Sequence, residues 1–97
     1  MFTVTVDESM LEKLRGMLED EDEGTCVRLC EYKVGGGSHA KIVLGLGMDE
    51  FDEDEDEQID IDGVPFAAEK DFLEKYGTAF TLSYGENKEV VLTANEA

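Results

Sequence analysis

The sequence predicts a mixed α+β fold that is rich in β-structure, with about seven short strands and two short helices in a single domain, residues 1–97. Three observations favour this class. Short runs alternate between apolar and polar residues, two segments have apolar residues at helical spacing, and glycines or charged clusters separate the runs. A chain of 97 residues with 41% hydrophobic residues is long enough for one core and too short for two.

The first half of the chain predicts a strand, a helix and two further strands. The residues at 2–6 alternate and indicate a strand. The helix that follows has one apolar face, made of Met10, Leu11, Leu14, Met17 and Leu18. Either Asp7 caps this helix or Ser9 and Glu12 form a capping box, and the sequence leaves both open. Strands are predicted at 25–32, with Val27 and Leu29 on one face, and at 40–48.

The second half predicts a hairpin, a short helix and two closing strands. Residues 58–68 have strand patterns on both sides of Asp62-Gly63, the favoured pair for a two-residue turn. A helix is predicted at 69–76 with Gly77 at its C-terminal cap. Strands follow at 79–84 and 89–93, and residues 94–97 read as a loose tail. Because only the first helix suits a crossover, the sequence argues against a βαβ parallel sheet.

Charge excludes some partners. The chain has 25 acidic and 8 basic residues, a formal net charge of −17, with acidic runs at Glu19–Glu23 and Asp49–Glu57. Nucleic acids and anionic membranes would repel it, so a protein partner with a basic surface, or no partner, is expected. Solubility alone is the first explanation of this charge, because a high net charge keeps proteins dispersed. We expect both acidic runs to be solvated loops, and the chain to be a monomer or a weak homo-oligomer.

Location follows from what the sequence lacks. The N-terminal residues have no basic segment followed by an apolar run, so no signal peptide is predicted. No segment approaches the roughly 20 apolar residues of a membrane span. We therefore expect a cytoplasmic protein with both thiols reduced.

The two cysteines do not form a site by their spacing. Cys26 and Cys30 share one face of the strand at 25–32, which puts their α-carbons about 13 Å apart. That separation is too long for a disulfide or for convergence on one metal ion. We expect core or half-buried thiols.

A glycine-rich segment, Gly35, Gly36, Gly37 and Ser38, precedes the single histidine, His39. A phosphate loop needs a helix behind it, and here a strand follows, so a flexible connector is expected. One histidine without a clear nucleophile is not a catalytic triad. The Asp60–Asp62–Gly63 pattern resembles part of a calcium loop but lacks an acidic first position and flanking helices, so the hairpin explains it better.

The order of these segments resembles the HesB-like domain of the A-type iron–sulfur carrier proteins. The resemblance covers Thr3 to Thr93, and two segments carry it: VRLCEYKVGGGSHAKIVLGL and IDIDGVPFAAEKDFLEKYGTAFTLSY. Its most specific part is the Asp62-Gly63 hairpin followed by a helix with Phe72 and Leu73. The resemblance implies a twisted β-sandwich. In carrier members, a cysteine in the glycine-rich loop and a Cys-Gly-Cys near the C-terminus bind iron or a [2Fe–2S] cluster.

This sequence departs from the family at those cysteines, since glycine stands near position 36 and no Cys-Gly-Cys follows. In a related branch a reactive cysteine or selenocysteine occupies the glycine-rich loop, and that residue is also missing here. We therefore expect a non-catalytic HesB-like accessory or binding module of iron–sulfur cluster biosynthesis, without a cofactor. The alternative is iron or cluster binding by Cys30 and His39 with help from a second subunit. The candidate partner-binding residues are Gly35, Gly36, Gly37, Ser38, Asp52, Glu53, Asp54, Glu55, Asp56 and Glu57.

Overall fold

The computed structural model describes residues 1–95 and confirms the β-rich α+β class. The elements are β1 (Thr3–Thr5), α1 (Glu8–Glu19), β2 (Thr25–Val34), a 3₁₀ turn η1 (Gly37–His39), β3 (Lys41–Glu50), β4 (Asp56–Ile61), β5 (Val64–Glu69), α2 (Lys70–Tyr76), β6 (Ala79–Tyr84) and β7 (Val90–Ala94). Neither α-helix in this part of the chain is long and apolar enough to cross a membrane.

The strands form two sheets, one with the order β1-β6-β7 and the other with the order β3-β2-β5-β4. Three ladders are antiparallel, and two are parallel: β1 with β6, and β2 with β5. The sheets are therefore mixed. The parallel pairs were not predicted, because β2 reaches β5 through two intervening strands rather than through a helix.

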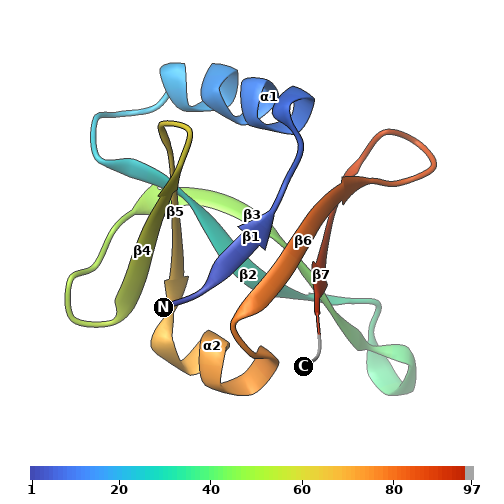
Figure 1. Cartoon of the computed structure of the whole chain (residues 1–97). Coiled ribbons are helices and arrows are strands. Elements are labelled where there is room, and N and C mark those ends of the chain that lie inside the picture. Colours follow the sequence, from blue (N-terminus) through green and yellow to red (C-terminus); the bar gives the residue numbers. More distant parts are fainter. Residues whose placement is uncertain (96–97) are drawn as a thin grey trace.

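One core of buried side chains joins both sheets and both helices. Figure 1 shows α1 and α2 at opposite ends of the molecule, with the strands between them. Its largest fully buried side chains are those of Phe2, just before β1, Phe66 in β5 and Phe80 in β6. Phe72 of α2 stacks on Phe80 with 5.5 Å between ring centroids. Burying one such side chain contributes roughly 1.5–3 kcal/mol, so this aromatic group holds the two layers together.

Asp7 caps α1, which decides between the two predicted caps. Its carboxylate accepts a hydrogen bond from the backbone N–H of Met10 at 2.8 Å, and the Ser9 hydroxyl donates to the same oxygen. An aspartate at this position satisfies an N–H that the helix itself leaves unpaired. The predicted apolar face is buried at Met10, Leu11 and Leu14.

The predicted Asp62-Gly63 turn is present between β4 and β5. Asp62 has φ 47° and Gly63 has φ 85°, the positive values that a two-residue hairpin turn of this kind needs. Arg15 of α1 donates two hydrogen bonds to the Asp62 carbonyl, at 3.1 and 3.3 Å. The turn therefore also positions the helix.

Several predicted boundaries are wrong by one or two residues. β2 continues to Val34 and β3 to Glu50, because the two strands pair along their whole length. Ala94, predicted to be in the tail, belongs to β7 and pairs with Phe80. Residues 96 and 97 of the predicted tail lie outside the described residues.

Replacing Asp7 by alanine should lower the free energy of unfolding by about 1 kcal/mol, because the Met10 N–H loses its acceptor. Ser9→Ala is the matched control and should change it by less than about 0.5 kcal/mol. Urea denaturation followed by circular dichroism measures both. Equal losses in the two variants would contradict the assignment of Asp7 as the cap.

Candidate functional site

The acidic run Asp49–Glu57 contains a shorter loop than the sequence predicts. Asp49 and Glu50 end β3 and pair with the first residues of β2. Asp56 and Glu57 begin β4 and pair with the last residues of β5. The prediction of a solvated loop or frayed linker is therefore wrong at both ends, and the connection itself is only Phe51–Glu55. Ladder hydrogen bonds use the backbone, so acidic side chains that face solvent do not prevent pairing.

Asp56 is the one buried charged residue within residues 1–95, with 4% of its surface exposed. The guanidinium of Arg28 donates two hydrogen bonds to its carboxylate, from Nη1 at 2.5 Å and from Nη2 at 2.9 Å. The backbone N–H of Asp52 donates a third at 2.8 Å, and Arg28 also reaches the Glu50 carbonyl. Hydrogen bonding to Arg28 lowers the pKa of Asp56, so its carboxylate stays charged. Asp56 is thus engaged inside the fold and is not presented to a partner, which corrects its predicted place in a partner-binding surface.

Local hydrogen bonds order the loop Phe51–Glu55. The Asp52 carboxylate accepts from the backbone N–H groups of Asp54 at 2.9 Å and Glu55 at 3.2 Å. The side-chain ammonium group of Lys70 in α2 donates a hydrogen bond to the Asp54 carbonyl, and the Lys70 backbone N–H donates one to the Glu55 carbonyl. The exposed carboxylates of Glu53, Asp54 and Glu55 are therefore held on a fixed backbone.

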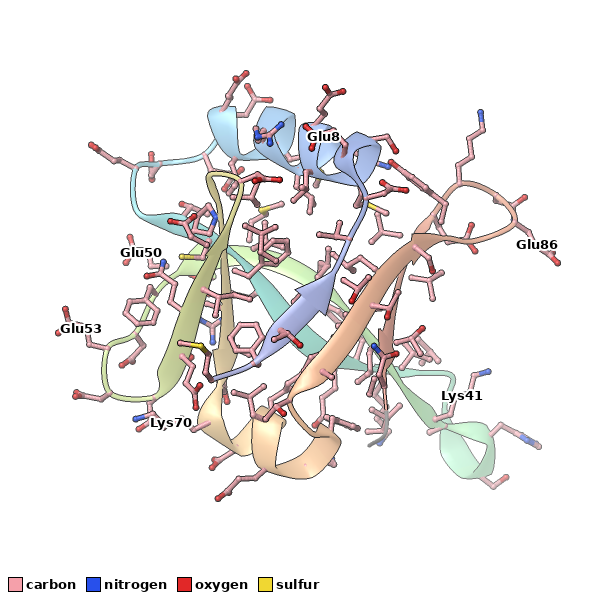
Figure 2. All side chains as sticks on the ribbon, viewed as in Figure 1. Glu8, Lys41, Glu50, Glu53, Lys70 and Glu86 are labelled. Atoms are coloured by element: carbon pink, nitrogen blue, oxygen red, sulfur yellow. The ribbon has the colours of Figure 1, made fainter. Side chains whose placement is uncertain are left out.

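Two acidic runs start from the same end of the β2–β3 ladder and then separate along the β4–β5 hairpin. Glu21–Glu23 lie beside Gly63 and Pro65 at the turn of this hairpin, whereas the loop Phe51–Glu55 contacts Lys70 at its other end. Glu19–Glu23 leads into Thr25, the first residue of β2, and Thr25 is the ladder partner of Glu50, the last residue of β3. We call Asp49–Glu55 the acidic pole. Figure 2 shows Glu50 and Glu53 at this end, and Lys41 at the other end of β3. No acidic residue occurs at 32–48, so the hairpin at the far end carries the opposite sign of charge.

Replacing Asp56 by asparagine should lower the free energy of unfolding by about 3–5 kcal/mol, because Arg28 would lose its charged partner at a site where its side chain is only 14% exposed. Asp54→Asn, an exposed carboxylate two residues away, is the matched control and should have little effect. Urea unfolding at neutral pH separates the two variants.

The same pair predicts a pH dependence. The pKa of Asp56 is lower in the folded chain than its ordinary value, so the ionised pair stabilises the fold fully above the ordinary aspartate pKa, about 3.9. This contribution is lost as the pH falls through the lower folded-state pKa. The difference in unfolding free energy between the wild type and Asp56→Asn should therefore shrink only below about pH 4. A difference that already vanishes at pH 6 would contradict the pairing.

Both cysteines are free thiols on the face of β2 that points away from Val27 and Leu29. Cys26 is buried, with the side-chain amide of Gln58 3.1 Å from its sulfur, and Cys30 is half-buried. Burial raises the pKa of each thiol. Because the thiolate is the nucleophile and the metal ligand, both environments oppose reactivity at neutral pH.

The glycine-rich segment, for which the sequence predicts a flexible connector, forms a turn of defined geometry. Gly35 and Gly37 have positive φ values of 80° and 59°, and a β-carbon on Gly35 would approach the His39 carbonyl oxygen to 3.0 Å. The His39 N–H donates to the Gly36 carbonyl at 3.2 Å, which closes η1. Glycine is therefore needed here for a tight reversal between β2 and β3.

The structure separates Cys30 from His39, the two residues of the alternative metal site. Cys30 pairs with Gly45 inside the ladder, whereas His39 lies beyond its last pair, Val34 with Lys41. Four strand residues span about 13 Å. Within residues 1–95, no group of three or more histidine, cysteine, aspartate or glutamate side chains is arranged to hold a metal ion.

A groove with a volume of about 470 Å³ lies where β2 outruns β5. β5 pairs with β2 only at Val27–Leu29, and after Glu69 the chain turns into α2. We call this cleft the β2–α2 groove; its lining residues are Arg28, Leu29, Cys30, Glu31, Tyr32, Glu69, Asp71, Phe72, Lys75 and Tyr76. Only Cys30 among them was a candidate site residue in the sequence, since the groove depends on a parallel pairing that the sequence did not predict.

Glu31 links the two walls of the groove. Its carboxylate accepts hydrogen bonds from Lys75 Nζ at 3.1 Å and from the Tyr76 hydroxyl. These bonds lower the pKa of Glu31, and the bond from the Tyr76 hydroxyl has the larger effect. They also raise the pKa values of Lys75 and Tyr76. The positive charge of Lys75 is therefore already matched within the chain.

Tyr32 lies flat across β3 because glycines leave room for its ring. A β-carbon on Gly45 would come within 2.9 Å of the ring, and one on Gly47 would come within 3.3 Å of the hydroxyl. The hydroxyl donates to the Leu46 carbonyl at 2.8 Å. The ring is nevertheless 44% exposed, so it forms part of the outer surface beside the groove.

Gly45→Ala should displace the Tyr32 ring and lower the free energy of unfolding by about 1 kcal/mol through the lost hydrogen bond. In a Tyr32→Ala background the same change should instead raise it by about 0.5 kcal/mol, because alanine restricts the unfolded chain. Gly16→Ala in α1, where nothing lies within 4 Å, should be stabilising in both backgrounds. A double-mutant cycle by urea denaturation measures the coupling, and additive effects would contradict the contact.

No protein-family model matches the chain, and the comparison with curated proteins finds no relative.

Proposed function

We propose that this chain is a non-catalytic binding module of the HesB-like type, which acts in the cytoplasm as an accessory to iron–sulfur cluster biosynthesis and docks on a protein with a basic surface. The observation that carries the proposal is the acidic pole, whose exposed carboxylates at Glu53, Asp54 and Glu55 lie on a backbone held by hydrogen bonds to Asp52 and Lys70. A concentrated field of one sign accelerates encounter with, and selects, a partner of the opposite sign.

The acidic pole is available for such a contact. Asp56, at the start of β4, is the only charged residue within the described chain that the fold buries. The four acidic residues of the loop Phe51–Glu55 are exposed. The one basic side chain that contacts the loop within residues 1–95 is Lys70, which is hydrogen-bonded to the Asp54 carbonyl, so the acidic side chains stay in excess. The loop backbone is fixed by the Asp52 and Lys70 hydrogen bonds, so its ordering costs little on binding.

The link to cluster biosynthesis rests on the resemblance to the HesB-like domain. The segments that carry this resemblance form β2 with β3 and β4 through β6. The glycine turn at 35–38, another predicted contact region, lies at the opposite end of the ladder from the acidic pole. It is not part of the proposed contact.

Affinity capture from a lysate of the source organism tests this proposal. The bait Glu53→Gln/Asp54→Asn/Glu55→Gln should retain its partners about tenfold less well than the wild type, because exposed ion pairs contribute about 0.2–1 kcal/mol each. The control Glu12→Gln/Glu74→Gln/Glu86→Gln has the same net charge and neutralises exposed carboxylates elsewhere.

The proposal requires that the control bait retain the partners, that 0.5 M salt release them, and that cluster-assembly proteins be among them. Equal losses from both triple variants would show ion exchange by net charge alone. Retention that is unchanged in the loop variant would remove the acidic pole from the interface.

A further inference from the structure

We propose that the open edge of β2 at Glu31–Val34 accepts an extended segment of a partner protein as an added strand, and that this segment carries lysine or arginine side chains. The proposal rests on the function proposed above, because it takes the basic partner as given and names a second surface, apart from the acidic pole, that binds an extended segment of it.

The backbone supports strand addition. β2 is paired with β3 along all of Thr25–Val34, whereas its other side is paired with β5 only at Val27–Leu29. Beyond Leu29, no strand within residues 1–95 covers that side, and only side chains of α2, Lys75 and Tyr76, reach across to the Glu31 carboxylate, so an added strand would displace them. In an extended strand, backbone N–H and C=O groups point alternately to either side, so this edge presents unpaired groups that an extended peptide can complete.

The groove beside this edge has the volume of a ligand pocket and a lining that mixes aromatic and charged side chains. Its volume of about 470 Å³ lies within the range of ligand pockets. α2 forms the second wall with Phe72 and Tyr76, whose rings are 4.9 Å apart. An added strand would therefore have the β2 backbone on one side and aromatic surface on the other.

Exposed apolar side chains extend from the groove along the same hairpin. Seven large hydrophobic residues are exposed within the described chain, and Tyr32, Val34, Ile42 and Val43 among them lie in its outer half. Tyr32 and Val34 share one face of the edge strand, and Tyr32 is opposite Val43 in the ladder. Alternate side chains of an added strand would cover Tyr32 and Val34.

The charges around the groove select a basic occupant. Arg28 is held by Asp56, and Lys75 is held by Glu31. Asp71 is exposed and has no ion-pair partner within residues 1–95, and Glu69, 60% exposed, is 3.5 Å from an Arg28 that is already paired. The unmatched charges of Glu69 and Asp71 are negative, while the edge segment itself carries one exposed cation, Lys33, so the local excess is a single negative charge. A second copy of the chain, with a net charge of −17, is disfavoured by repulsion.

A direct test uses a fluorescent short peptide of alternating lysine and valine and its twin with N-methyl groups on alternate amides. The twin has the same charge but cannot complete the strand hydrogen bonds, so it should bind at least tenfold more weakly. Amide chemical shifts of the labelled protein should change at Cys30–Val34 with the unmethylated peptide.

Two protein variants of equal net charge complete the test. Glu69→Gln/Asp71→Asn should weaken peptide binding about fivefold, whereas Glu53→Gln/Asp54→Asn at the acidic pole should change it by less than twofold. Both pairs are exposed, and circular dichroism verifies that each variant is folded.

The outcomes separate the two proposals. Equal binding of both peptides, or shifts confined to Phe51–Glu55, would overturn strand addition and leave the acidic pole as the contact. Peptide binding that fails while the capture experiment succeeds would overturn only the β2 edge. Failure of both experiments would overturn the binding module itself.

Discussion

The buried ion pair between Arg28 and Asp56 fixes the arrangement on which the rest of the structure depends. Arg28 belongs to β2 and Asp56 begins β4, so the pair joins two strands that are not neighbours in the sheet. The same groups bind the Asp52 N–H and the Glu50 carbonyl, which sets where β3 ends and the acidic loop begins. One carboxylate inside the fold thus orders the backbone that carries the exposed ones, and its removal would loosen the whole acidic pole.

Local patterns were sufficient to predict most elements of this fold. The Asp62-Gly63 turn, the apolar face of α1 and the Gly77 cap were found because each depends on neighbouring residues. The role of Asp56 could not be found in this way, since nothing local distinguishes it from the acidic residues around it. Its partner lies 28 residues earlier, and only the alignment of β2 with β4 across β5 brings the two together.

The β2–α2 groove was missed for a related reason. It exists because a long strand is paired in parallel with a short one that turns into a helix at Lys70. Alternation in the sequence predicts that β2 is long and that β5 is short, but the pairing between them, which leaves part of β2 open, is a long-range contact. The glycines at 45 and 47 were a usable signal, because glycine inside a strand often marks the close approach of another group, here the Tyr32 ring.

Charge gives the open edge its selectivity. An exposed strand edge with apolar side chains such as Tyr32 and Val34 is ordinarily a template for self-association. In this chain each copy carries a net charge of −17, so two edges approach against the repulsion of both bodies, most strongly at low salt. A segment with lysine or arginine meets the opposite sign of field at Glu69 and Asp71. The acidity that keeps identical edges apart is therefore the same property that admits a basic strand.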